Sequence, residues 1–180
     1  MRYAQIRSMD ISNGEGVGVS LFVQGCDRHC FNCFNSETWD FNGGKEWTEE
    51  AKNKFMELID RPYIRRISVL GGEPLAEQNL DEVLSLIKEI RISFPKKSIW
   101  LYTGYELSEI IKQEQYEKVS GIPSVWSKRW KIISNIDVLV DGEYIDEQKD
   151  LTLKWRGSKN QNCIDVKQSL AQNKVVLYCD

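Results

Sequence analysis

The strongest constraint on the fold is an alternation of short β-rich runs with helix-forming segments. Four runs rich in β-branched and aromatic residues recur along the chain, and each ends in a loop signal: residues 19–23, 67–70, 98–102 and 136–140. Helical patterns fill the gaps between them. Strands that alternate with helices form right-handed βαβ units, whose strands are parallel. The sequence therefore predicts an α/β fold with a mainly parallel sheet.

The helical segments are marked by capping residues and by apolar spacing. Thr48 precedes two glutamates, an order typical of an N-cap and a first helical turn. Asn79 and Glu82 form a capping-box-like start, and apolar residues follow at helical spacing as far as Ile90. A third, shorter helix is predicted over residues 106–113.

Length and charge limit the classes of protein to consider. The chain has 180 residues, with 24 basic and 27 acidic side chains and a net charge of −3, so we expect one domain over residues 1–180. A mildly acidic chain is a poor general binder of nucleic acid. No apolar run reaches the roughly 20 residues of a membrane span, and the N-terminus lacks the apolar core of a signal peptide. We expect a cytoplasmic protein with neither nucleic-acid nor membrane partners.

The loops that follow the predicted strands hold the distinctive residues. In parallel α/β sheets these loops lie along one edge, where ligands bind. They are the cysteine-rich residues 26–33, the Gly-Gly-Glu-Pro run 71–74, and residues 103–105 and 141–143. The sequence thus predicts a ligand site at this edge.

Three of the five cysteines, Cys26, Cys30 and Cys33, lie within eight residues. In a reducing compartment such spacing indicates metal or redox chemistry before disulfides. Closed zinc sites and ordinary iron-sulfur clusters use four protein ligands, so three thiolates leave one position open. An open position lets a small molecule bind the metal directly.

A structural zinc site is the alternative interpretation of the triplet. His29, Cys163 or Cys179 would then supply the fourth ligand, and the protein would be a zinc-binding module or a simple electron carrier. The spacing disfavours this reading, because structural zinc sites usually combine two Cys pairs or a Cys pair with a His pair.

The triplet resembles the cluster loop of the radical S-adenosylmethionine enzymes. The resemblance implies that Cys26, Cys30 and Cys33 hold a 4Fe-4S cluster whose fourth iron binds S-adenosylmethionine. It also implies a partial (βα) barrel of the radical S-adenosylmethionine type.

A second element strengthens the resemblance. Gly71, Gly72, Glu73 and Pro74 look like the GGEP element of these enzymes, which contacts the methionyl amino group. Glycine suits such a place because a bare backbone permits close approach of a ligand. By the same resemblance, Gly71, Gly72 and Glu73 are predicted to bind the cofactor.

The residues beside the third cysteine are candidates to contact the adenine of S-adenosylmethionine. Many members of the superfamily carry an aromatic residue just before the third cysteine, but this chain has Asn32 there and Phe34 just after Cys33. Asn32, by hydrogen bonding, and Phe34, by stacking, are the two candidates for the adenine contact, and Cys33 lies between them.

Most of the chain is similar to the activating enzymes of anaerobic ribonucleoside-triphosphate reductase. The segments that carry this similarity are residues 10–16, 19–26, 33–35, 99–105, 137–142, 149–153 and 155–161. Residues 115–134 look like an insertion, and we interpret the aromatic and basic run 126–131 within it as a surface segment.

This resemblance implies an oxidoreductase that activates another enzyme. It would reductively cleave S-adenosylmethionine to a 5'-deoxyadenosyl radical, which generates a glycyl radical on the large subunit of the reductase. The cofactors carry the radical, so no side chain is expected to act as a catalytic residue. A small electron donor such as flavodoxin is the expected second partner. The alternative is another small radical S-adenosylmethionine enzyme, either a different glycyl-radical activase or a small-molecule synthase; residues 155–161 argue against it.

Two further motifs remain. The Gly14-Xaa-Gly16-Xaa-Gly18 run precedes a strand, so it is predicted to form a turn and no phosphate-binding loop. Arg156, Asn160 and Gln161 suit either docking of a partner or a structural network.

Overall fold

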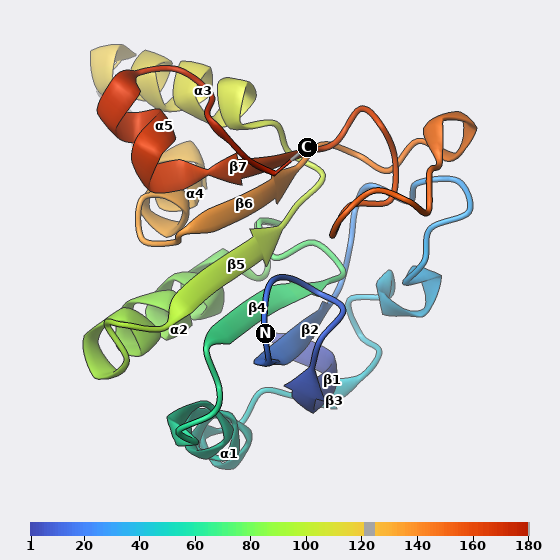
Figure 1. Cartoon of the computed structure of the whole chain (residues 1–180), viewed down its shortest axis with the longest axis vertical. Coiled ribbons are helices and arrows are strands. Elements are labelled where there is room, and N and C mark those ends of the chain that lie inside the picture. The colour runs from blue at the N-terminus through green and yellow to red at the C-terminus, as the bar shows by residue number, and fades with distance from the viewer. Residues whose placement is uncertain (121–124, 180) are drawn as a thin grey trace.

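One mixed sheet forms the centre of the computed structural model, which describes residues 1–120 and 125–179. Its strand order is β3-β1-β2-β4-β5-β6-β7-β8 (Figure 1). The strands are β1 (Arg2–Asp10), β2 (Gly18–Gln24), β3 (Lys45–Glu46), β4 (Arg66–Gly71), β5 (Ser98–Tyr102), β6 (Val138–Asp141), β7 (Asn162–Asp165) and β8 (Leu177–Cys179).

The α/β class is confirmed, but the prediction of a mainly parallel sheet is wrong. Only β2, β4, β5 and β6 run parallel to one another, and these are the four strands expected from the sequence. β1 and β3 extend one side of the sheet with antiparallel pairs, and β7 and β8 extend the other. Parallel neighbours need a long crossover, whereas β1 is joined to β2 by residues 11–17 alone, a connection short enough for antiparallel pairing. β7 is joined to β8 through α5, yet these two strands also pair antiparallel.

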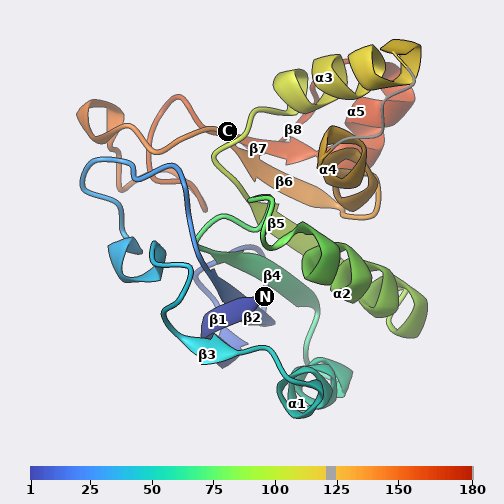
Figure 2. The same ribbon diagram turned by 180° about the vertical axis from the view of Figure 1, so that it is seen from behind.

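In the described part of the chain, five α-helices cover one face of this sheet (Figure 2). They are α1 (Glu49–Asp60), α2 (Leu80–Ser93), α3 (Leu107–Ser120), α4 (Val125–Ile133) and α5 (Val166–Gln172). Side chains alternate along a strand, so every second residue faces the helices. Leu21, Val69, Leu101 and Leu139 occupy these positions and are completely buried with the apolar helix faces. None of the helices described is long and apolar enough to cross a membrane.

The helix starts agree with the sequence in one case and differ in the other. Thr48 caps α1, because its hydroxyl oxygen accepts a hydrogen bond from the Ala51 amide at 3.2 Å. Asn79 stands at the N-cap position of α2 but makes no side-chain cap. Its amide instead donates to the carbonyls of Gln24 and Glu73, both at 3.1 Å, and so joins α2 to the loops that follow β2 and β4.

The opposite, inner face of the sheet is closed at one end by a buried ion pair. Arg66 is fully buried and lies 3.5 Å from the Asp10 carboxylate. Its guanidinium also donates to the Asp10 and Asn13 carbonyls. A side chain on Gly14 would lie 2.5 Å from Arg66, and Gly14 has a φ of +128°. The predicted glycine turn is therefore present, and it wraps around an arginine.

The segment interpreted as an insertion is not a surface addition. Residues 121–124 lie outside the described part, but the flanking residues complete α3 and form α4. Arg129 on α4 is buried and donates to the Leu75 carbonyl at 3.0 Å and to the Tyr105 hydroxyl at 2.8 Å. The prediction of a surface segment is wrong here, because a basic residue that finds such partners can be buried.

Candidate functional site

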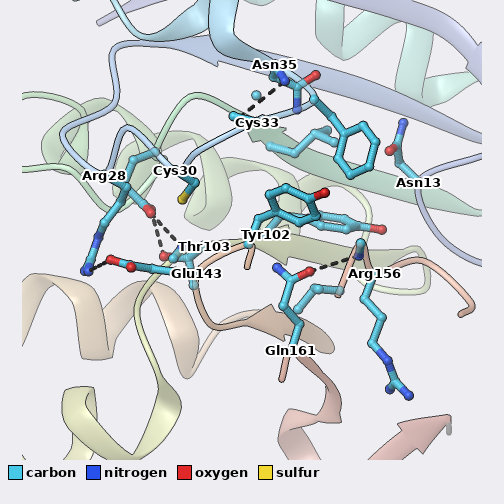
Figure 3. Close-up of a pocket in the computed structure, with 18 of the residues that line it drawn as sticks. Asn13, Arg28, Cys30, Cys33, Asn35, Tyr102, Thr103, Glu143, Arg156 and Gln161 are labelled. Atoms are coloured by element: carbon cyan, nitrogen blue, oxygen red, sulfur yellow. Dashed lines mark hydrogen bonds and ion pairs between the residues drawn. The ribbon is translucent and has the colours of Figure 1, made fainter. Parts of the chain in front are cut away.

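A cavity of about 420 Å³ opens where the central parallel strands end. Its lining comes from the loops after β2, β4, β5 and β6, together with residues 151–161 (Figure 3). Seven of the eight predicted site residues line it: Cys26, Cys30, Cys33, Phe34, Gly71, Gly72 and Glu73. The eighth, Asn32, does not. The cavity thus lies at the sheet edge expected from the sequence.

The cysteine loop leaves β2 through a tight turn. Gly25 has a φ of +98°, and a side chain there would collide with Phe41 at 2.0 Å. The Gly25 and Cys26 amides donate to the carbonyls of Thr38 and Trp39, at 2.8 and 3.0 Å, so the loop closes on itself. These bonds fix the start of the loop, and all three of its cysteines line the cavity.

The three thiols differ in exposure. Cys26 is buried, and burial raises its pKa to about 11. Cys30 is half-buried, and burial raises its pKa as well. The Cys33 sulfur accepts a hydrogen bond from the Asn35 amide at 3.4 Å. All three line one cavity, although no trio of His, Cys, Asp or Glu side chains in the described residues is drawn together closely enough to hold an ion.

The Gly-Gly-Glu element packs against the end of β2. A side chain at Gly71 would lie 2.8 Å from the Phe22 backbone, and one at Gly72 would lie 2.4 Å from the Gly25 carbonyl. Both glycines are therefore required by contact between neighbouring strands, whether or not a ligand is bound. The Gly72 and Glu73 amides donate to the carbonyls of Val23 and Gly25, which fixes the element beside the cysteine loop.

The carboxylate of Glu73 is occupied by protein donors. It is fully buried and accepts hydrogen bonds from the Leu75 amide at 2.8 Å, the Thr103 hydroxyl at 2.7 Å and the Gly104 amide at 2.8 Å. Burial raises the pKa of this carboxyl, and those three donors oppose the rise. Glu73 thus ties the loop after β4 to the loop after β5.

Phe34 and Asn32 take different directions from the cysteine loop. Phe34 lines the cavity and packs on Tyr144 with ring centroids 5.0 Å apart. Asn32 is exposed, and its amide donates to the Asp146 carboxylate at 2.9 Å. Of the two candidates for the adenine contact, only Phe34 is at the cavity.

A stack of cationic and aromatic groups supports the rim. The Arg28 guanidinium lies 3.8 Å from the centre of the Tyr105 ring, and Arg129 lies 4.2 Å from the same ring. Arg28 also bonds the Glu143 carboxylate at 2.7 Å, which links the cysteine loop to the loop after β6 (Figure 3). None of these contacts was foreseen, because no motif marks them in the sequence.

The inner wall of the cavity carries two polar atoms without a partner. Among the described residues, the Tyr102 hydroxyl and the Arg156 Nε are buried and make no hydrogen bond. Both residues line the cavity. Buried polar groups are nearly always paired, so these two atoms indicate that the cavity receives a polar ligand.

The C-terminal polar residues have different roles. The Gln161 side chain accepts from the Gly157 amide at 2.9 Å and donates to the Gly142 carbonyl at 2.9 Å. Asn160 donates to the Glu143 carbonyl at 2.7 Å. These two form a structural network. Arg156 also lines the cavity, but its guanidinium points away from the cavity and donates to the Cys179 carbonyl at 3.4 Å (Figure 3).

The residues of the zinc alternative do not complete the site. Cys163 and Cys179 are absent from the cavity lining and face each other across β7 and β8. His29 is exposed and packs on Trp39 with ring centroids 4.7 Å apart.

Comparison with known proteins gives consistent matches. Residues 12–164 match the model of a family described as a 4Fe-4S single cluster domain. Proteins named anaerobic ribonucleoside-triphosphate reductase-activating protein are similar along nearly their whole length. Those of Vibrio cholerae and Escherichia coli K12 are 37% and 36% identical over 163 residues, which cover 89% of this chain and 96% of each relative. The relative from Enterobacteria phage T4 is 34% identical over 163 residues, which cover 89% of this chain and 92% of the relative.

Proposed function

Because the chain belongs to the family of anaerobic ribonucleoside-triphosphate reductase-activating proteins, we propose that its cavity holds the cofactors of that activity. The protein is an oxidoreductase with a 4Fe-4S domain, and it activates the reductase by generating its glycyl radical. The observation that carries the assignment of the site is that three thiols, two glycines and two unpartnered polar atoms line one cavity.

Cys26, Cys30 and Cys33 are the proposed cluster ligands. Their donor set fits the group, because thiolates are the usual ligands of 4Fe-4S clusters and three of them leave one iron free. The loop that carries them is anchored by backbone hydrogen bonds at Gly25 and Cys26, and ligation would require the three thiols to come closer together than they lie in this structure.

S-adenosylmethionine is the proposed small-molecule ligand. The cavity is within the size range of sites for ligands of this kind. Gly71, Gly72 and Glu73 would meet the methionyl end through their backbone, since the Glu73 carboxylate is already occupied. Phe34 would meet the adenine by stacking, and the Tyr102 hydroxyl would find its missing partner on the ligand. Asn32 takes no part in this proposal.

When bound, the reduced cluster supplies the electron that cleaves the sulfonium bond of S-adenosylmethionine. The chain's own residues position the reactants and exclude water. Glu73 holds two strand-end loops together, and Arg28 closes the rim by its bond to Glu143. In the proposed partial barrel, the ligand would lie against the inner face of the sheet, on the side opposite the helices.

The target of the activity is the reductase, and we propose that a glycine-bearing loop of its large subunit enters the open side of the cavity. A small electron carrier such as flavodoxin is the proposed donor, and the cytoplasm the proposed location. The whole chain, residues 1–180, is proposed to act as one domain.

The test is anaerobic reconstitution of the full chain with iron and sulfide, followed by reduction and addition of S-adenosylmethionine. Formation of 5'-deoxyadenosine would establish the chemistry, and a glycyl radical signal on added reductase would establish the target. Zinc bound in place of the cluster would refute the site. Formation of 5'-deoxyadenosine without a radical on the reductase would favour another small radical enzyme.

A further inference from the structure

Two cysteines outside the cavity face each other across neighbouring antiparallel strands. Cys163 on β7 and Cys179 on β8 are register partners. Both pack on the inner face of the sheet beside Trp100 and Val140. Burial and the neighbouring Cys179 thiol together raise the pKa of the Cys163 thiol. The two sulfur atoms are therefore adjacent, although 16 positions separate them in the sequence.

The backbone geometry at this pair suits a covalent bond. Paired residues of antiparallel strands have Cα atoms about 4.5 to 5.5 Å apart. Disulfides need Cα separations of about 4.4 to 6.8 Å, a range that includes most of the spacing of such pairs. The register shifts between Cys163 and Ile164, directly beside this pair. The remaining cysteines of the chain lie on the loop of residues 26–33 and line the cavity, which Cys163 and Cys179 do not.

We propose that Cys163 and Cys179 form a reversible redox site, which a low-molecular-weight disulfide converts to an intramolecular disulfide. Cys179 is partly exposed and Cys163 is fully buried, so Cys179 reacts first. Its thiolate attacks one sulfur of the oxidant and releases one thiol. The Cys163 thiolate then attacks the Cys179 sulfur and releases the second. The protein loses two electrons and two protons, and the oxidant is reduced to two thiols.

The bond would fasten the wall behind the cavity. Tyr178 precedes Cys179, and its ring packs on Trp100 and Trp155, with centroids 5.1 and 6.1 Å away. Trp155 lines the cavity, and the Cys179 carbonyl accepts a hydrogen bond from Arg156, also in the lining, at 3.4 Å. Attachment of β8 to β7 thus reaches two lining residues without touching the cysteine triplet.

The experiment uses the full chain with its cluster in place, kept anaerobic and equilibrated with mixtures of oxidised and reduced glutathione. Free thiols are then alkylated, and the protein is digested with trypsin and analysed by mass spectrometry. Cys163 falls in the peptide 160–167, and Cys179 falls in the peptide that begins at Val175. Cys30 and Cys33 share another peptide, and Cys26 falls in a third, so each pairing has its own mass.

The expected product is the crosslinked pair of the peptides that carry Cys163 and Cys179, which dithiothreitol separates again. The C179S and C163A variants should each abolish this crosslinked product. The C179S variant is expected to keep its fold, because Cys179 is partly exposed. The linked form should also resist removal of the last strand by carboxypeptidase more than the reduced form. A crosslink to the triplet, or glutathione on Cys179 with Cys163 still free, would overturn the proposal.

Discussion

The two faces of the sheet are made from the same strands, but buried polar residues of the strands lie on only one of them. On the face covered by helices, residues such as Leu21, Val69 and Leu101 pack with apolar helix residues and leave no polar group to satisfy. On the inner face, the neighbouring positions hold Ser20 and Ser68, and the strands end at a cavity.

This contrast assigns different tasks to alternate residues of one strand. Apolar burial stabilises the fold roughly in proportion to area, so the helix-covered face supplies most of the stability. Polar groups on the inner face gain little net free energy from burial, even where, as at Ser68, hydrogen bonds hold them in place. Substitutions on the two faces should therefore separate loss of activity from loss of stability.

The largest effect on activity is expected at the cysteine loop. Cys33→Ala removes one proposed cluster ligand, so formation of 5'-deoxyadenosine should fall to background. The free energy of unfolding should change little, because Cys33 is only half-buried. Product assays of the reconstituted variant, with urea denaturation beside them, measure both quantities.

Cys179→Ser is the matched control, since it also removes one thiol but lies outside the cavity lining. It should keep cleavage of S-adenosylmethionine. Product formation by Cys33→Ala would show that Cys33 is not a ligand, and Cys26 and Cys30 can be tested in the same way.

The opposite result is expected for Phe55 on the helix-covered face. Phe55 on α1 is completely buried, so Phe55→Ala should lower the free energy of unfolding by about 4 kcal/mol, from lost burial and the cavity left behind. Cleavage of S-adenosylmethionine per folded molecule should be unchanged. Urea denaturation measures the loss. Ile92→Ala on α2 is the control, because Ile92 is 81% exposed and should cost less than about 0.5 kcal/mol. Equal losses at the two sites would contradict this picture.

How far the sequence predicts the structure also differs between the two regions. The parallel strands and the start of α1 follow from local signals, namely β-rich runs, apolar spacing and the Thr48 cap. β1 was missed because exposed polar residues such as Gln5 and Arg7 weaken its apolar pattern. β7 and β8 are short, and pairing between them depends on tertiary contacts.

Prediction from the sequence is limited in the same way at the cavity. Motif spacing identified the cysteines and Gly71 to Glu73, because backbone geometry and ligand chemistry restrict those residue types. It did not identify Tyr102 or Arg156, whose buried unpartnered atoms are visible only in the folded chain. Arg129 was predicted to lie in a surface segment but is buried, because residue type alone places an arginine on the surface.

Arg129 tests whether the helix-covered side supports the cavity. Arg129→Met removes the hydrogen bonds to the Leu75 carbonyl and the Tyr105 hydroxyl while keeping apolar bulk. The free energy of unfolding should fall by roughly 2 kcal/mol, the cost of an unsatisfied buried group. The KM for S-adenosylmethionine should rise, because both partners belong to loops at the cavity. Urea denaturation and initial rates at varied S-adenosylmethionine measure the two effects.

Lys131→Met is the control, since Lys131 lies on the same helix and is exposed. It should change neither quantity. A stability loss in Arg129→Met with an unchanged KM would show that this side of the sheet does not reach the site.

The smallest effect is expected at Asp137, beside the far end of the strands from the cavity. Burial raises the pKa of this carboxyl, but hydrogen bonds from Arg91, at 2.7 Å, and from Lys167 outweigh it and leave the pKa below its ordinary value. A lowered pKa in the folded state stabilises the protein above the unfolded pKa of about 3.9, and the contribution disappears as the pH falls through the folded value. Asp137→Asn should therefore cost roughly 1 to 2 kcal/mol at pH 7, and the difference from the unchanged chain should shrink below about pH 4. Urea denaturation at several pH values measures this difference.

Asp81→Asn is the control. It breaks a surface pair with Lys128 and should cost less than about 0.5 kcal/mol. If the difference in free energy of unfolding between Asp137→Asn and the unchanged chain stayed constant down to pH 3, the ionic bonds of Asp137 would not contribute to stability. The stability of this end of the sheet would then come from apolar packing alone.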